Sequence, residues 1–173
     1  DAVVCRHTLE HIANLQDFLQ QLAQWARRDP ARVVLFEVPA AERVLDEAAF
    51  WDVYYEHCNY FTAESMAHAF EAAGFEVMHH ERVYGDQYLI LEARAARQPA
   101  PATASDFTSL RLQSVRFGQR AREAIAHCDR HLATMAASGR PVVLWQGAAK
   151  TVGFLASLNS VAPIHSAVDL SPE

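Results

Sequence analysis

The near-continuous apolar run "RVVLFEV" at residues 32–38 most constrains what this chain can fold into. Such a run is typical of a strand in a parallel sheet that is covered on both faces. A shorter run, "AVVC" at residues 2–5, is also expected to form a buried strand. Between them, residues 13–28 carry apolar side chains at helical spacing, with Asn14 as the expected N-cap. Strand, helix and strand in this order predict an α/β fold.

The next part of the chain predicts a helical layer and the end of the sheet. A short acidic helix is expected over residues 40–49, and a second helix is expected between an N-cap at Thr62 and the helix-ending Gly74. The alternating pattern of residues 75–95 then turns at a Gly-Asp pair, which predicts an antiparallel hairpin.

A change of composition separates this region from the rest of the chain. Residues 96–105 are rich in proline, alanine and serine, as expected for a linker. A long helical pattern continues to about Ala137, and the sequence then reads strand, tight turn, helix and strand as far as Asp169. This last pattern predicts the start of a second α/β unit.

Charge and cysteine content exclude some classes of protein. The formal net charge of −6 argues against general binding to nucleic acid or membrane surfaces, because both need a basic face. No apolar run approaches the roughly 20 residues of a membrane span. The cysteines Cys5, Cys58 and Cys128 are odd in number, widely spaced and form no CxxC pair. They favour a reduced, cytoplasmic compartment.

The stretch "WDVYYEHCNYF" at residues 51–61 surrounds Glu56 and His57 with aromatic side chains. Taken alone, it is either an aromatic core with this pair at its rim or a site that moves protons. Histidine titrates near neutral pH, and an adjacent glutamate can orient it or act as a base itself. The residues alone leave both interpretations open.

Two further segments lie where α/β proteins bind ligands. Arg6 and His7 follow the first strand, and ligands of open α/β sheets bind beyond the carboxyl ends of the strands. "WQGAAK" at residues 145–150 lies between a strand and a helix, where a glycine lets N–H groups approach an anion. It ends in Lys150, which is the only lysine of the chain. Cys5 and the nearby histidines match no common zinc spacing, so no metal site is predicted.

The order of these motifs resembles a known family. "RHTLEHI" at residues 6–12, followed by a helix, a strand and a terminal hairpin, resembles the second half of class I S-adenosylmethionine (SAM) dependent methyltransferases. "YYEHCNYF", "WQGAAK" and "AVDLSP", in this order, resemble the sugar C-methyltransferases, which act on nucleotide-linked 4-keto-deoxysugars. The family's glycine-rich SAM loop and zinc-binding N-terminal domain have no counterpart in the sequence, so we expect a fragment. Thr151 stands where the family usually has glycine.

The resemblance implies an α/β fold that ends one Rossmann-like sheet and begins another. The implied regions are 1–95, the C-terminal part of a SAM-dependent methyltransferase domain; 96–138, a linker and long helix; and 139–173, the beginning of a C-terminal Rossmann-like domain. The resemblance also implies the site residues. Glu56 and His57 would be the candidates for the base, with Tyr54 and His11 as supporting catalytic groups. Arg6 and His7 would lie beside SAM, and the nucleotide sugar would contact Gly147, Lys150, Tyr55 and Asn59. Which member of the Glu56–His57 pair takes the proton stays open.

Two other functions remain. The chain could serve a methyltransferase of the same architecture with a non-sugar substrate, or it could be a non-catalytic binding module that keeps only the fold. A partial sheet leaves strand edges and apolar faces exposed, so self-association is also expected.

Overall fold

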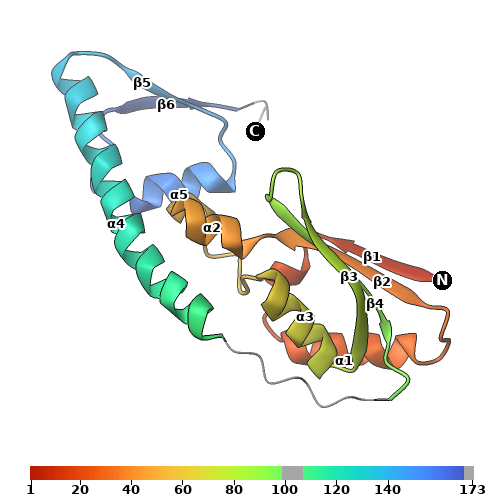
Figure 1. The fold of residues 1–173 in the computed structure, drawn as a ribbon. Coiled ribbons are helices and arrows are strands. Elements are labelled where there is room, and N and C mark those ends of the chain that lie inside the picture. Colours follow the sequence, from red (N-terminus) through yellow and green to blue (C-terminus); the bar gives the residue numbers. More distant parts are fainter. Residues whose placement is uncertain (99–106, 170–173) are drawn as a thin grey trace. The chain divides into compact units, whose positions relative to one another are not determined.

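Residues 1–98 and 107–169 are described by the computed structural model, and the chain divides into two compact units (Figure 1). The first unit contains Asp1–Arg43 and Glu56–Phe107, and the second contains Val44–Tyr55 and Thr108–Glu173. From residue 99 onward the expected linker lies outside the described residues. The described chain contains no helix that is long and apolar enough to cross a membrane.

A mixed four-stranded sheet forms the first unit, in the order β1-β2-β4-β3. β1 and β2 run parallel, whereas β4 is antiparallel to both β2 and β3. The strands are β1 (Ala2–Arg6), β2 (Val33–Pro39), β3 (Phe75–Val83) and β4 (Tyr88–Ala95). The predicted α/β fold with a terminal antiparallel hairpin is confirmed.

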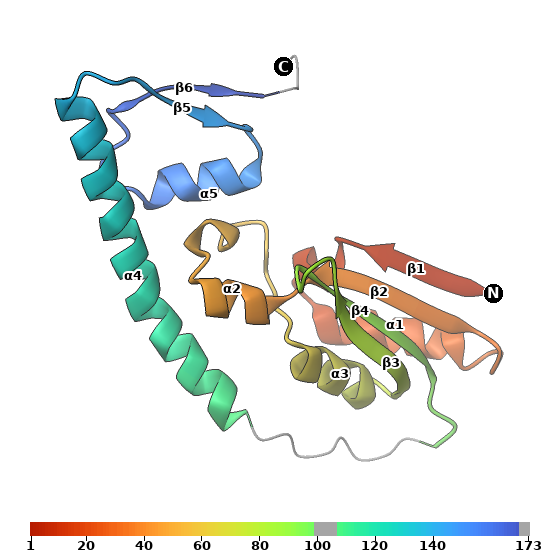
Figure 2. The same ribbon diagram turned by 45° about the horizontal axis from the view of Figure 1, so that its top comes forward.

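Two helices, α1 (Leu15–Ala26) and α3 (Ala63–Ala72), cover one face of this sheet (Figure 2). Alternate residues of the two central strands point to that face and are fully buried, as the period of two of a strand requires. The helices contribute further buried side chains to the same core. This core contains Val34, Phe36 and Val38 of β2, Leu89, Leu91 and Ala93 of β4, Leu19 of α1, and Met66 and Phe70 of α3.

The prediction that the first strand is buried is wrong. β1 lies at the edge of the sheet, where Val3 and Cys5 pack against the core while Val4 is 63% exposed. The prediction that β2 is covered on both faces holds only in part, because Leu35 on its other face is only half-buried. An apolar run does not distinguish an edge strand from a central one, since strand order depends on pairing across the whole sheet.

The helix starts show both correct and incorrect details. Asn14 occupies the N-cap of α1, but its side-chain amide donates to the Asp17 carboxylate at 2.5 Å and accepts nothing from the helix backbone. Thr62 caps α3 as predicted, in a capping box with Ser65, and Gly74 follows the helix with a left-handed φ of 92°. The predicted acidic helix is α2 (Ala41–Glu47).

The second unit contains a parallel strand pair joined by a helix. β5 (Val142–Trp145) and β6 (Ile164–Val168) pair in parallel, α5 (Ala149–Ser157) lies between them in sequence, and α4 (Thr108–Ala137) precedes them. These elements confirm the expected start of a second Rossmann-like α/β unit.

Residues 44–55 pack within this second unit. Phe50, at the start of the 3₁₀ helix η2 (Phe50–Asp52), stacks on Phe154 of α5 with ring centroids 5.9 Å apart. Gly153 is required there, because a Cβ would lie 2.8 Å from the main-chain oxygen of Trp51. The division into regions 1–95, 96–138 and 139–173 stays a prediction about domains.

Replacing Thr62 with alanine tests the capping box. The N–H of Ser65 would lose its acceptor, so we expect the free energy of unfolding to fall by about 1 kcal/mol in chemical denaturation. Thr134→Ala is the matched control, because the Thr134 hydroxyl bonds a carbonyl within α4. An equal loss in both variants would contradict the capping role.

Candidate functional site

The site begins in the sharp turn that follows β1. Arg6 ends the strand, and His7 adopts a left-handed φ of 49° while its N–H donates to the main-chain oxygen of Glu37 at 2.9 Å. The 3₁₀ helix η1 (Leu9–His11) comes next, and its Leu9 and Glu10 are buried. The turn therefore lies at the carboxyl edge of the parallel strands, as predicted for a ligand-binding loop.

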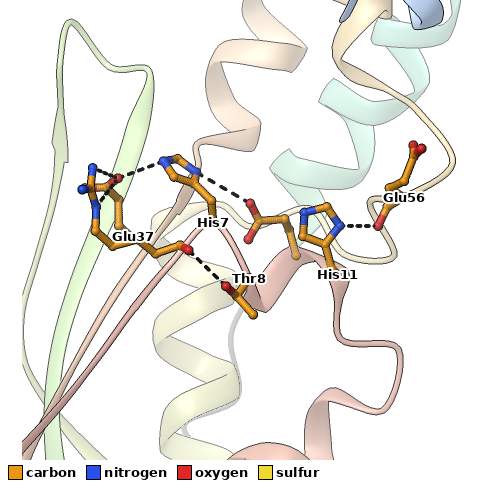
Figure 3. A network of polar contacts seen from close by, with 7 residues as sticks. His7, Thr8, His11, Glu37 and Glu56 are labelled. Carbon is orange, nitrogen blue, oxygen red and sulfur yellow. Dashed lines mark hydrogen bonds and ion pairs between the residues drawn. The ribbon is translucent and has the colours of Figure 1, made fainter. Parts of the chain in front are cut away.

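A buried carboxylate on β2 fixes this turn. Oε1 of Glu37 accepts from Nε and Nη2 of Arg6 at 3.0 and 2.9 Å and lies 3.0 Å from Nε2 of His7 (Figure 3). The hydrogen bonds from Arg6 raise the pKa of its guanidinium above the ordinary value. Glu37 was not predicted as a site residue, although it is the one acid in an otherwise apolar strand.

The segment that starts at Glu56 is tied to this turn by main-chain hydrogen bonds. The N–H groups of Cys58 and Asn59 both donate to the main-chain oxygen of Glu10, at 2.8 and 3.0 Å. The Asn59 side-chain amide adds a bond of 2.8 Å to the carbonyl of Ile12. Asn59 thus supports the loop, and its Oδ1 is the side-chain atom that could accept a hydrogen bond from a ligand.

Two histidines meet where these segments join. Nδ1 of His11 lies 2.7 Å from the main-chain oxygen of Glu56 (Figure 3). Because a carbonyl only accepts, Nδ1 carries a proton, and in the neutral ring Nε2 keeps the lone pair. The ring of His57 packs edge-on against that of His11, with centroids 4.9 Å apart. The carboxylate of Glu56 is exposed and points away from His11, so their contact is through the main chain.

Glu10 brings a buried carboxyl group close to this histidine pair. Its side chain is 3% exposed, and Oε1 lies 3.8 Å from Nδ1 of His7. Its Oε2 has no hydrogen-bond partner among the described residues. One ligand atom each from Glu10, His11 and His57 lies within 4.8 Å of the others, so these groups could hold a cation. Local spacing could not reveal this cluster, because His57 comes from a distant segment.

The remaining predicted site residues belong to the second unit. Tyr55 is 97% exposed, and Tyr54 is half-buried. Nζ of Lys150 pairs with the Asp52 carboxylate at 2.8 Å. A Cβ at Gly147 would lie 2.8 Å from Oδ2 of Asp169, so this turn has a carboxylate beside it.

Removing the charge of Glu37 should destabilise the turn more than the same change at an exposed carboxylate. We expect Glu37→Gln to lower the free energy of unfolding by about 1 to 3 kcal/mol, because charged hydrogen bonds to a buried group are lost. Glu76→Gln is the matched control, since Arg94 binds the exposed Glu76 in a similar way. Equal losses of unfolding free energy in the two variants, measured by chemical denaturation, would show that the burial of Glu37 does not strengthen its contribution to stability.

Cysteine labelling tests the exposure of the site loop. Burial raises the pKa of the Cys5 and Cys128 thiols, which lowers their thiolate fraction at neutral pH, whereas Cys58 is exposed. We expect iodoacetamide to modify Cys58 first, as followed by peptide mass spectrometry. Raising the pH should increase the labelling of Cys5 and Cys128. In the unfolded chain, Cys58 should no longer be labelled first. Faster labelling of Cys5 than of Cys58 would contradict this arrangement.

Comparison with known proteins agrees with the geometry of the first unit. Residues 1–80 match the family model described as a methyltransferase domain. No curated protein gives a significant match to the chain. Methyltransferase domains of this class typically use SAM, and the parallel strands with a terminal hairpin fit their Rossmann-like fold. The match therefore supports a methyltransferase domain, and with it SAM-dependent methyl transfer, for residues 1–80 of the chain.

Proposed function

We propose that the protein is a C-methyltransferase that acts on a nucleotide-linked 4-keto-deoxysugar. The observation that supports this best is the histidine pair at the carboxyl edge of β1. His11 is held in one tautomer by the Glu56 carbonyl, and His57 packs against it. This arrangement offers fixed proton-accepting groups where an α/β sheet binds its ligand.

The proposed reaction forms a carbon–carbon bond. A base removes the proton from the carbon next to the ketone, and the electron pair of that C–H bond forms an enolate. The enolate carbon attacks the methyl group of SAM, and the electron pair of the broken S–CH₃ bond stays on sulfur. A donor close to the enolate oxygen lowers the barrier by stabilising the developing charge.

The residues near His11 divide into base candidates and supporting groups. Glu56 has an exposed carboxylate, and His57 has an imidazole at the same loop, so either could take the proton. The Glu56 carbonyl leaves Nε2 of His11 as the ring nitrogen that, in the neutral ring, accepts a hydrogen bond or a proton. We assign to Tyr54 the role of donor to the enolate oxygen.

The cofactor is proposed to bind along the turn after β1. We place the methionine part of SAM beside Arg6 and His7. The bonds to Glu37 hold both side chains in place, so the turn would not need to be ordered when the cofactor binds.

The contacts proposed for the nucleotide sugar follow the resemblance. Lys150, half-exposed beside Asp52, supplies a positive charge for the diphosphate, and Gly147 lies in the turn before its helix. Asn59 offers its Oδ1 to a sugar hydroxyl, and Tyr55 offers an exposed aromatic ring.

One observation favours a second candidate, a methyltransferase of the same architecture with a non-sugar substrate. Asp52 pairs with Lys150, and Asp169 lies against Gly147. Two carboxylates close to the proposed diphosphate contacts weaken the attraction for an anion. A neutral small ketone would not meet that repulsion.

Hydrogen exchange at the substrate carbon tests the base without methyl transfer. In D₂O the protein should catalyse incorporation of deuterium next to the ketone of a nucleotide-linked 4-keto-deoxysugar, measured by NMR. Loss of a general base typically costs about 10²- to 10⁴-fold in rate. We therefore expect a loss of that size in Glu56→Gln or in His57→Asn, whichever residue is the base.

The exposed residues Glu64 and His80 provide matched controls for this experiment. Glu64→Gln and His80→Asn should leave the exchange rate unchanged. Exchange that is undiminished in both Glu56→Gln and His57→Asn would contradict the assigned roles. Methylation of a non-sugar ketone, together with no exchange of any keto-sugar nucleotide, would favour the second candidate.

A further inference from the structure

We propose that Glu10, His11 and His57 form a binding site for a divalent cation such as Zn²⁺. One ligand atom from each of the three side chains lies within 4.8 Å of the others. Two imidazoles and one carboxylate are a common ligand set of zinc sites that keep an open coordination position. This proposal is independent of the substrate proposed above.

His11 has the hydrogen bonding expected of a metal ligand. A metal-bound histidine generally donates its other ring N–H to a carbonyl, carboxylate or water, which fixes the tautomer and the ring orientation. Nδ1 of His11 does this with the main-chain oxygen of Glu56 at 2.7 Å. Nε2, on the far side of the ring from Glu56 in Figure 3, therefore has the lone pair for a cation.

Glu10 supplies the second, independent observation. Its side chain is 3% exposed, and Oε2 is buried without a hydrogen-bond partner among the described residues. Nδ1 of His7 is 3.8 Å from Oε1, which is too far for a hydrogen bond. Burying a carboxylate oxygen without a partner is unfavourable, and a cation bound to Oε2 would remove that cost.

Only small shifts are needed for coordination. Zinc lies about 2.0 to 2.2 Å from nitrogen and oxygen ligands, so the ligand atoms of a tetrahedral site are about 3 to 3.5 Å apart. Because the present ligand atoms lie within 4.8 Å of one another, the side chains would have to approach by up to about 1.5 Å. The main-chain bonds from Cys58 and Asn59 to the Glu10 carbonyl keep their loops together while the side chains adjust.

Cation binding would also bear on the choice of base. A lone pair of His57 that binds a cation cannot take a proton from a substrate. In the cation-bound protein, Glu56 would then be the remaining candidate for the base of the pair. This consequence is separate from the binding test below.

Binding of Zn²⁺ by calorimetry, and of Co²⁺ by its d–d absorption, tests the site without SAM or substrate. We expect one tight site in the unaltered protein, and no sulfur-to-cobalt charge-transfer band, because no thiol is a ligand. Even loss of an outer-shell partner weakens metal binding by about 10- to 100-fold. Glu10→Gln, His11→Asn and His57→Asn should therefore each weaken it by at least about tenfold.

An exposed histidine–glutamate pair of β3 gives the matched control. His79 lies 3.5 Å from Glu81, and both side chains are more than half exposed. His79→Asn and Glu81→Gln should leave the tight site unchanged. Zn²⁺ should also raise the thermal unfolding midpoint of the unaltered protein, because it binds only the folded state, and should not do so in the His11→Asn and His57→Asn variants.

Three results would overturn the proposal. They are the absence of a tight site in the unaltered protein, unchanged affinity in the three ligand variants, and a charge-transfer band that shows thiol ligation. If Glu10→Gln does not fold, the two histidine variants decide the matter, since His11 is exposed and His57 is half-buried. None of these outcomes depends on the substrate, so they are distinguishable from a failure of the proposed methyl transfer.

Discussion

The main-chain oxygen of Glu10, which accepts N–H groups from both Cys58 and Asn59, holds the candidate site together. Each such bond contributes only about 1 kcal/mol, but the pair fixes one loop against the other in position and direction. As a consequence, the rings of His11 and His57 meet in a T-shaped contact. The side chain of Glu10 brings a buried negative charge to the same place, so one residue supplies both the geometry and the electrostatics.

A second carboxylate determines the shape of the neighbouring turn. Glu37 lies on a central strand, and its Oε1 meets Arg6 and His7 just where the chain leaves β1 in a left-handed conformation. A non-glycine residue in that conformation is strained, and the bonds of Glu37 offset the strain. The two buried acids thus give the carboxyl edge a fixed arrangement of charges. An ordered turn of this kind would lose less entropy on binding a ligand than a mobile one.

Features that depend on neighbours in the sequence were predictable, and features that depend on distant contacts were not. The apolar run of β2, the capping role of Thr62 and the glycine after α3 are local, and the structure confirms them. The exposure of Val4 depends on the place of β1 at the sheet edge, which no local pattern gives. The buried acids Glu10 and Glu37 were missed for the same reason, because their partners lie in other segments. The order of motifs suggested His11 and His57, whereas their contact required the fold.

The central claim is that the turn after β1 and the loop at residues 56–59 form one ligand site. A titration of the ¹⁵N-labelled protein, first with S-adenosylhomocysteine and then with a nucleotide-linked keto-sugar, tests it most directly by NMR. We expect the first ligand to shift the amide signals of Arg6 and His7, and the second to shift those of His57 and Asn59. Signals that stay unmoved in both segments while the ligands bind elsewhere would contradict the claim.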